Sequence, residues 1–145
     1  MSLKRILEQK GRDVKTCTGQ CKVTDCAAAM NQSNIGAMVI IDDNNDISGI
    51  VTERDVLKAV ETHNGSVENI FVPDVMTGKN ELVIVDINEP VEKVMDLMTN
   101  KRIRHIPVTE NGDLAGIISI GDVVKTLLEK VLAENESMKN YISGV

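Results

Sequence analysis

Along this chain, segments with apolar residues at helical spacing alternate with short apolar runs that are typical of strands. Val91, Val94, Met95 and Met98 are spaced three or four apart and share one face of a predicted helix. Two short apolar runs, "AMVIID" and "HIPVTE", are typical of strands, and each leads into a polar turn, "DDNND" or "ENGD", that indicates a hairpin. The returning strands are "SGIV" and "AGIIS", and the helices that follow are "ERDVLKAVE" and "GDVVKTLLEK". With an extended entry segment before each first helix, "DVKTC" or "ELVIV", the pattern predicts the order β-α-β-β-α twice.

The two sets of elements are copies of one unit. Residues 23–60 align with residues 91–128, with one residue of slippage in the polar turns. The aligned pairs include Met30 with Met98, Ile35 with Ile103, Val39 with Pro107 and Gly49 with Gly116. The octet "GIVTERDV" therefore recurs as "GIISIGDV".

Each copy has about 60 residues, which is near the lower limit for a self-sufficient core. We therefore expect the copies to bury apolar sheet faces against each other about a pseudo-two-fold axis, leaving two equivalent clefts. The predicted fold class is α/β (α+β). The predicted boundaries are 8–64 for repeat 1, 73–131 for repeat 2 and 132–145 for a C-terminal helical tail.

The predicted tail carries two apolar stripes. Their members are Leu127, Leu128, Val131 and Leu132 in the first, and Met138, Tyr141 and Ile142 in the second. An isolated helix cannot bury such residues alone. They pack either on the core of the same chain or on a partner subunit.

Composition narrows the class of protein. The 145 residues are 42% hydrophobic and 26% charged, as in an ordinary globular chain. A net charge of −6 and only two aromatic residues, Phe71 and Tyr141, argue against a nucleic-acid partner, which needs clustered cations and stacking rings. No apolar run is long enough to span a membrane, and the start lacks the apolar core of a signal peptide, so we expect a cytoplasmic protein with no membrane partner.

Three cysteines, Cys17, Cys21 and Cys26, lie within one short stretch. Their spacings of four and five fit neither a CxxC redox pair nor a usual zinc pattern. Reduced thiols in or near the core are the favoured interpretation, with a redox or metal role as the alternative. We predict no metal site.

The repeated octet has two physical interpretations. Thr52-x-x-Asp55 and Ser119-x-x-Asp122 both match a capping box, in which a hydroxyl and an acid begin a helix. A strand that enters a helix also presents free N–H groups and a positive dipole end, which suit an anion. An acid one turn on can accept hydrogen bonds from ribose hydroxyls.

A basic run, "KRIRH", covers residues 101–105. Lys101 and Arg102 are expected to be solvated at a helix end, where positive charge suits the dipole. Arg104 and His105 enter the following strand, so we expect one of them to face a cleft.

Four motifs together, "GIVTERDV", "GIISIGDV", "DVMT" and "RHIPV", resemble those of a free-standing pair of cystathionine-β-synthase-type (CBS) domains. The resemblance extends from about Val14 to Lys130. It implies a tandem β-α-β-β-α fold that binds an adenine nucleotide between the repeats. It also implies that the pair forms a homodimer.

The resemblance assigns roles to individual residues. Asp55 and Asp122 would hold ribose hydroxyls, and Thr52 and Ser119 would contact phosphate or ribose. Arg104 and His105 would face the phosphates; the equivalent residues of the first copy, Gly36 and Ala37, carry no charge, so the two clefts are expected to be unequal. The remaining predicted nucleotide-binding positions are Ile35, Gly36, Met38, Ile50, Ile106, Pro107 and Ile117.

The motifs leave three candidate functions for the chain. No Ser-His-Asp order, P-loop or HExxH motif occurs, so we predict no catalytic residue and no catalytic cofactor. The favoured function is a regulatory sensor of AMP, ADP, ATP or NAD(H) that transmits occupancy through packing or dimer changes to an unknown regulated protein. The alternatives are a structural interaction module without a ligand, and a pair that binds S-adenosylmethionine.

Overall fold

The computed structural model describes the backbone of residues 2–142 and the side chains of residues 2–138. The elements in chain order are α1 (Leu3–Lys10), β1 (Thr16–Thr18), α2 (Val23–Ser33), β2 (Ala37–Ile41), β3 (Ile47–Thr52), α3 (Glu53–Thr62), the 3-10 helix η1 (Val72–Asp74), β4 (Thr77–Gly78), β5 (Val85–Asp86), α4 (Val91–Lys101), β6 (His105–Glu110), β7 (Asp113–Ser119) and α5 (Ile120–Ile142). The predicted order β-α-β-β-α occurs as β1-α2-β2-β3-α3 and as β5-α4-β6-β7-α5. This confirms the mixed α/β fold of two repeats. α1 and β4 were not predicted.

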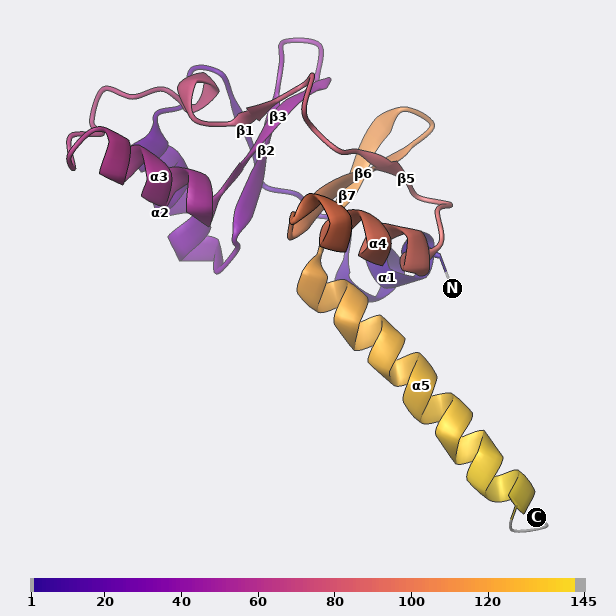
Figure 1. The fold of residues 1–145 in the computed structure, drawn as a ribbon. Coiled ribbons are helices and arrows are strands. Elements are labelled where there is room, and N and C mark those ends of the chain that lie inside the picture. Colours follow the sequence, from indigo (N-terminus) through magenta and orange to yellow (C-terminus); the bar gives the residue numbers. More distant parts are fainter. Residues whose placement is uncertain (1, 143–145) are drawn as a thin grey trace.

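Each half is built on its own small sheet (Figure 1). The first sheet has the order β1-β2-β3-β4, and the second has the order β5-β6-β7. In both, the first strand is parallel to the second and the second is antiparallel to the third. Val39 lies opposite Ile50 in one hairpin and Pro107 lies opposite Ile117 in the other, so the predicted alignment of the copies holds at the level of strand register.

The helix ends repeat as well. α2 and α4 both end in a left-handed residue, Asn34 with φ 52° and Arg102 with φ 54°. The N–H of Ile35 donates to the Met30 carbonyl at 3.0 Å, and that of Ile103 donates to the Met98 carbonyl at 3.1 Å. These bonds satisfy the last carbonyls of each helix and turn the chain sharply into β2 or β6.

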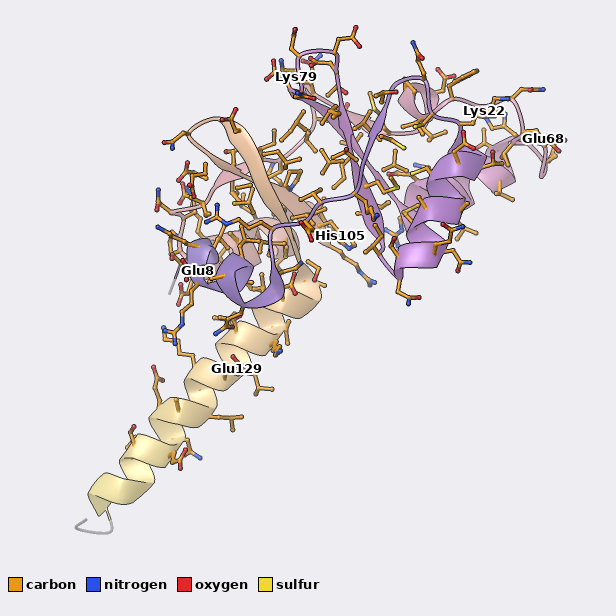
Figure 2. The ribbon with its side chains drawn as sticks, turned by 180° about the vertical axis from the view of Figure 1, so that it is seen from behind. Glu8, Lys22, Glu68, Lys79, His105 and Glu129 are labelled. Atoms are coloured by element: carbon orange, nitrogen blue, oxygen red, sulfur yellow. The ribbon has the colours of Figure 1, made fainter. Side chains whose placement is uncertain are left out.

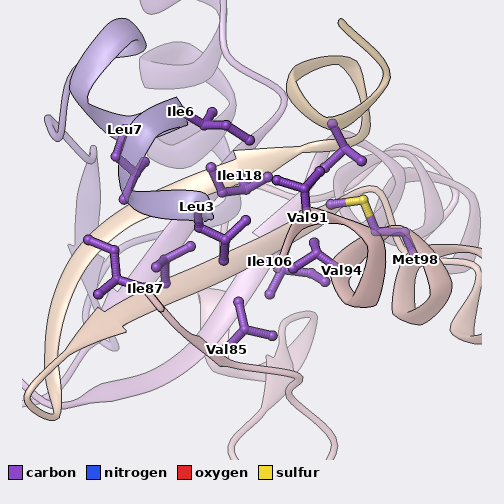
Figure 3. Packing of buried hydrophobic residues seen from close by; sticks show 12 residues of the cluster. Leu3, Ile6, Leu7, Val85, Ile87, Val91, Val94, Met98, Ile106 and Ile118 are labelled. Carbon is purple, nitrogen blue, oxygen red and sulfur yellow. The ribbon is translucent and has the colours of Figure 1, made fainter. Parts of the chain in front are cut away.

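The second half closes around a core that includes the N-terminal helix (Figure 3). α1 contributes Leu3, Ile6 and Leu7, none more than 5% exposed. These pack with buried residues of the second repeat, namely Val85, Ile87, Val91, Val94, Met98, Ile106, Val108, Ile118 and Val123. A helix that precedes the first repeat in sequence therefore stabilises the second repeat.

The first half has a separate, smaller core. Its buried members are Cys26, Met30, Met38, Ile40, Val51 and Val72. Cys17 and Cys21 pack at its rim, and all three cysteines are free thiols. Burial raises the pKa of Cys17 to about 12 and that of Cys26 to about 11, so both thiols stay protonated at neutral pH.

The two hydrophobic clusters are separate, one in each half, rather than one core shared by both sheets. Each sheet covers a core of its own with helices from its own side, so the halves are two lobes. The opposite sheet faces are nevertheless closed. Val39, Ile50 and Pro107 alternate with core residues along their strands and are buried without belonging to either core.

Two edge segments are exchanged between the halves, and the octet glycines permit this. β4 follows the first repeat's last helix yet returns to pair with β3, and α1 lies on β7. A Cβ atom on Gly49 would lie 2.6 Å from Met76 Sδ and 2.7 Å from the Thr77 carbonyl oxygen. A Cβ atom on Gly116 would lie 2.6 Å from Leu7 Cδ2. Each glycine therefore allows one exchanged segment to approach its sheet.

The predicted tail is the continuation of α5, which runs unbroken to Ile142 and projects from the body (Figure 1). Val123 and Thr126 in its first turns are buried, and Leu127 packs on the second core. Leu128, Val131, Leu132 and Met138 do not pack on this chain and are 56–62% exposed, while the side chains of Tyr141 and Ile142 lie outside the described residues. No helix among the described residues is long and apolar enough to cross a membrane.

We expect Gly49→Ala to lower the free energy of unfolding by about 1–3 kcal/mol, because its methyl group meets the backbone of β4. Urea denaturation measures the change. Gly78→Ala is the matched control, because Gly78 pairs with Gly49 but a Cβ atom there meets nothing within 4 Å. Equal destabilisation by the two substitutions would contradict the steric explanation.

Candidate functional site

A cavity of about 620 Å³ opens between the two halves. It is lined by Gly36, Ile50, Thr52, Glu53, Arg54, Asp55, Leu57, Thr77, Glu81, Leu82, Val83, Arg102, Ile103, Arg104 and His105. Figure 2 shows His105 at the junction of the two lobes. We call this space the Asp55 cavity. It brings Thr52 and Asp55 of the first repeat together with Arg104 and His105 of the second repeat.

The Thr52–Asp55 pair forms the junction between β3 and α3. The Thr52 N–H donates to Asp55 Oδ2 at 2.9 Å, and the Asp55 N–H donates to Thr52 Oγ1 at 3.3 Å. The Thr52 hydroxyl also lies 3.2 Å from Asp55 Oδ2. The capping interpretation is therefore correct for this pair. These bonds use Oδ2 and not the second carboxylate oxygen, Oδ1, so capping and ligand contact are compatible.

The cavity holds both signs of charge. Its cationic side chains are Arg54, Arg102 and Arg104, and its acidic side chains are Glu53, Asp55 and Glu81. Arg102, which we expected to be solvated at a helix end, is exposed and also lines the cavity. A bound molecule can therefore meet guanidinium groups for an anion and carboxylates for hydroxyl or cationic groups.

His105 is a hydrogen-bonding group rather than a cation near neutral pH. Burial lowers the pKa of its half-buried imidazole, although the Glu53 carboxylate acts in the opposite direction. Gly36 makes room for both groups, since a Cβ atom there would lie 2.8 Å from Glu53 Oε1 and 3.2 Å from His105 Cε1. Of the predicted basic pair, Arg104 thus carries the charge.

The equivalent junction of the second repeat is built in the same way. The Ser119 N–H donates to Asp122 Oδ2 at 2.9 Å, and the Asp122 N–H donates to Ser119 Oγ at 3.2 Å. The next backbone bonds also match, because the Glu53 N–H donates to the Gly36 carbonyl at 3.0 Å and the Ile120 N–H donates to the Arg104 carbonyl at 2.8 Å. The two helix starts therefore differ in their surroundings rather than in their own geometry.

A lysine from α1 occupies the second junction. Lys10 Nζ lies 2.6 Å from Asp122 Oδ2 and donates to the Ile117 carbonyl at 2.9 Å. Burial by itself would raise the pKa of Asp122, but hydrogen bonds from Lys10 and from the Ser119 N–H outweigh it and hold that pKa below its usual range. Sequence reasoning missed Lys10, because nothing local indicates that α1 docks on the second repeat.

The other predicted lining residues lie in different places. Ile50 is on the wall of the Asp55 cavity, and Ile35 lines a separate cavity of about 430 Å³ beside α2 and α3. Met38 and Ile106 are at most 2% exposed and belong to the two cores, and Pro107 is buried. The candidate site therefore does not include Met38, Ile106 or Pro107.

Four apolar residues of the Asp55 cavity were not predicted. They are Leu57, Leu82, Val83 and Ile103. Ile103 is adjacent to the predicted Arg104, and Leu82 and Val83 belong to the extended segment that enters the second repeat. The continuous apolar run of that segment, residues 82–85, was the available signal, but it does not say which half the side chains face.

Comparison with known proteins gives a consistent result. The family model described as the CBS domain matches residues 10–62 and 72–129. CBS domain-containing protein CBSX3, mitochondrial, from Arabidopsis thaliana is 34% identical over 145 residues, covering 96% of this chain and 70% of that protein. The crystal structure of the CBS-domain containing protein ATU1752 from Agrobacterium tumefaciens has a TM-score of 0.82 at 40% identity, covering 87% of this chain and 98% of that one.

Two structures below 25% identity share the fold and contain adenosine compounds. CBS domain protein PAE2072 from Pyrobaculum aerophilum, complexed with AMP, has a TM-score of 0.74 at 22% identity, covering 84% of this chain and 89% of that one. The CBS domain pair of protein MJ0100, in complex with 5-methylthioadenosine and S-adenosyl-L-methionine, has a TM-score of 0.78 at 23% identity, covering 90% and 98%.

We expect Lys10→Ala to raise the pKa of Asp122, because the substitution removes a hydrogen bond and a positive charge. The lowered pKa means that the Asp122 carboxylate stabilises the fold above its usual pKa and that this contribution is lost as the pH falls through the folded-state value. In Lys10→Ala the loss should begin at higher pH. NMR titration of the Asp122 side chain measures the pKa.

Arg12→Ala is the control for this experiment, because it breaks an ion pair of the same segment, with Glu110 at 3.4 Å, away from Asp122. It should leave the Asp122 titration unchanged. An Asp122 pKa that is the same in Lys10→Ala and in the unsubstituted protein would contradict the assigned contact.

Proposed function

The chain belongs to the CBS domain family, as a tandem pair of CBS domains, and on this premise we propose that it senses an adenine nucleotide bound in the Asp55 cavity. The candidates are AMP, ADP, ATP and NAD(H). One observation carries the proposal: a ribose-binding type of acid, Asp55, and a phosphate-binding type of cation, Arg104, come from different halves and line the same cavity. The AMP complex of a distant relative with the same fold supports it.

The cavity suits the three parts of a nucleotide. Its volume of about 620 Å³ lies within the range of small-molecule sites. Asp55 can accept from ribose hydroxyls through Oδ1, while its Oδ2 remains in the cap. Arg104 can hold phosphate oxygens, and Arg54 and Arg102 lie in the same cavity. The adenine would lie against aliphatic side chains such as Ile50, Val83 and Ile103.

We assign one nucleotide to each chain, and we place it on the first repeat's side. Asp122 already accepts the ammonium group of Lys10 at 2.6 Å, and the Ile117 carbonyl accepts from the same group. A ribose at this position would have to displace an ion pair, whereas a ribose at Asp55 would not. The lack of charge at Gly36 and Ala37 adds to the difference, because the first repeat has no counterpart of Arg104 to offer the second site.

Sensing follows from the position of the ligand between the halves. A molecule that contacts Asp55 on one lobe and Arg104 on the other changes the free energy of their packing. The regulated protein would respond to that change. We propose a binding role without catalysis, since the two junction acids are equivalent members of a repeat and do not form an acid–base pair within one site.

S-adenosylmethionine is the second candidate ligand. Its sulfonium is a cation, and the cavity offers Glu53 and Glu81 as well as the three arginines. The MJ0100 complex supports this alternative. The ligand has no phosphate, so it would not depend on Arg104.

Isothermal titration with AMP, ADP, ATP, NADH and S-adenosylmethionine tests the site. We expect at least one of these to bind with one molecule per chain, and we expect Asp55→Asn to weaken that binding by tenfold or more, because a charged acceptor is lost. Asp122→Asn is the matched control, since it alters the equivalent acid next to Lys10 and should leave the affinity within about twofold. A protein that binds none of the five would instead act as a structural interaction module.

Arg104→Ala separates the two classes of ligand. For a phosphate-bearing ligand we expect about a ten- to a hundred-fold loss of affinity, the worth of a charge-assisted hydrogen bond. For S-adenosylmethionine we expect no comparable loss. If a bound nucleotide keeps its full affinity in this variant, its phosphates do not contact Arg104.

A further inference from the structure

The projecting part of α5 carries an apolar stripe that this chain leaves uncovered. Val124, Leu128, Val131, Leu132 and Met138 are 48–62% exposed. They lie along one side of a helix that extends from the body into solvent, on the part of α5 where Glu129 is labelled (Figure 2). Large apolar side chains in a continuous stripe mark an interaction surface.

The stripe has the spacing of a coiled coil. Val124, Leu128, Val131, Asn135 and Met138 alternate steps of four and three residues, so they occupy the positions d, a, d, a and d of a heptad repeat. Leu132 at the neighbouring e position widens the stripe. The opposite side is polar or small and consists of Glu129, Lys130, Ala133, Glu136 and Ser137.

The stripe lies beside the face of α5 that packs on the body, and its side chains are exposed. Val123, Thr126 and Leu127 hold the first turns of α5 against the second half, and they occupy positions c, f and g. At 100° per residue the a and d positions lie about a quarter-turn further round the helix than these residues, on the flank of the face that packs on the body. A second helix can therefore approach the stripe without displacing any contact that the structure contains.

Asn135 indicates which kind of helix pairs with the stripe. A single asparagine at an a position, between apolar a and d residues, specifies a parallel, in-register pair of helices, because each asparagine then hydrogen-bonds its own counterpart. In an antiparallel pair, a positions face d positions, and Asn135 would oppose a valine or a methionine. In an apolar groove of an unrelated protein it would be a buried amide without a partner, which is costly.

We propose that α5 forms a parallel, two-stranded coiled coil with α5 of a second copy of this chain, through the stripe from Val124 to Met138. The assembly holds the bodies of the two chains side by side at the N-terminal ends of the paired helices. This proposal does not depend on the ligand of the Asp55 cavity. It assigns the homodimer that the resemblance implied to a particular surface.

Mass measurement by light scattering tests the surface. We expect the protein to have about twice the chain mass of 15.8 kDa and the double variant Leu128→Glu/Val131→Glu to have the mass of one chain. The double variant Ala133→Glu/Ser137→Glu adds the same charge on the polar side of α5 and should remain dimeric. A dimeric stripe variant, a monomeric control or a monomeric parent protein would each overturn the proposal, and a cooperative urea unfolding transition of the stripe variant verifies that its body is folded.

Cross-linking tests the orientation. In a parallel, in-register pair, a cysteine at position 135 faces its own counterpart, so Asn135→Cys should form a disulfide-linked dimer on mild oxidation. Ala133→Cys, on the polar side, should not. The three native thiols are present in both variants, so a cross-link through them would also appear in the Ala133→Cys control. A dimer whose Asn135→Cys variant does not cross-link is not parallel.

Discussion

One carboxylate caps each junction between a strand and the helix that follows it. Asp55 and Asp122 both use Oδ2 to accept from the backbone of the residue that ends the preceding strand, and both return an N–H to its hydroxyl. This reciprocal cap fixes where the helix starts and the direction in which the acid points. Everything that the proposed site requires of these acids depends on that orientation. At Asp55 the cap uses Oδ2 and not Oδ1, so the capping interpretation of the octet does not conflict with the proposed ligand contact.

Much of the fold could be predicted because its signals are local. The faces of α4, the hairpin turns and the duplicated octet are all spelled out within ten residues, and the alignment of Met30 with Met98 and of Ile35 with Ile103 reappears as matching helix ends. One cavity is lined by four of the predicted site residues, namely Thr52, Asp55, Arg104 and Ile50. The local signals of the repeat also account for this part of the prediction. Each lies at a fixed place in a repeated unit, so its position in one copy implies its position in the other.

The remainder depends on contacts between distant segments. Nothing near Leu3 indicates that α1 completes the second core, and so nothing near Lys10 indicates that its ammonium group reaches Asp122. The state of His105 has the same origin. A histidine beside an arginine in sequence suggests a basic pair, but burial at the junction of the lobes lowers its pKa. Met38 and Ile106 were expected in the wall of a cleft. Their side chains instead face the two cores and are buried.

The exchange of edge segments makes the two repeats interdependent. The helix at the start of the chain completes the lobe at the end of the chain, and a strand encoded after the first lobe returns to its sheet. A cut midway between the repeats would hence give two fragments that each lack a piece held by the other. Although the sequence is a tandem duplication, the folded molecule has no point at which one copy could be lost or transplanted as an autonomous domain.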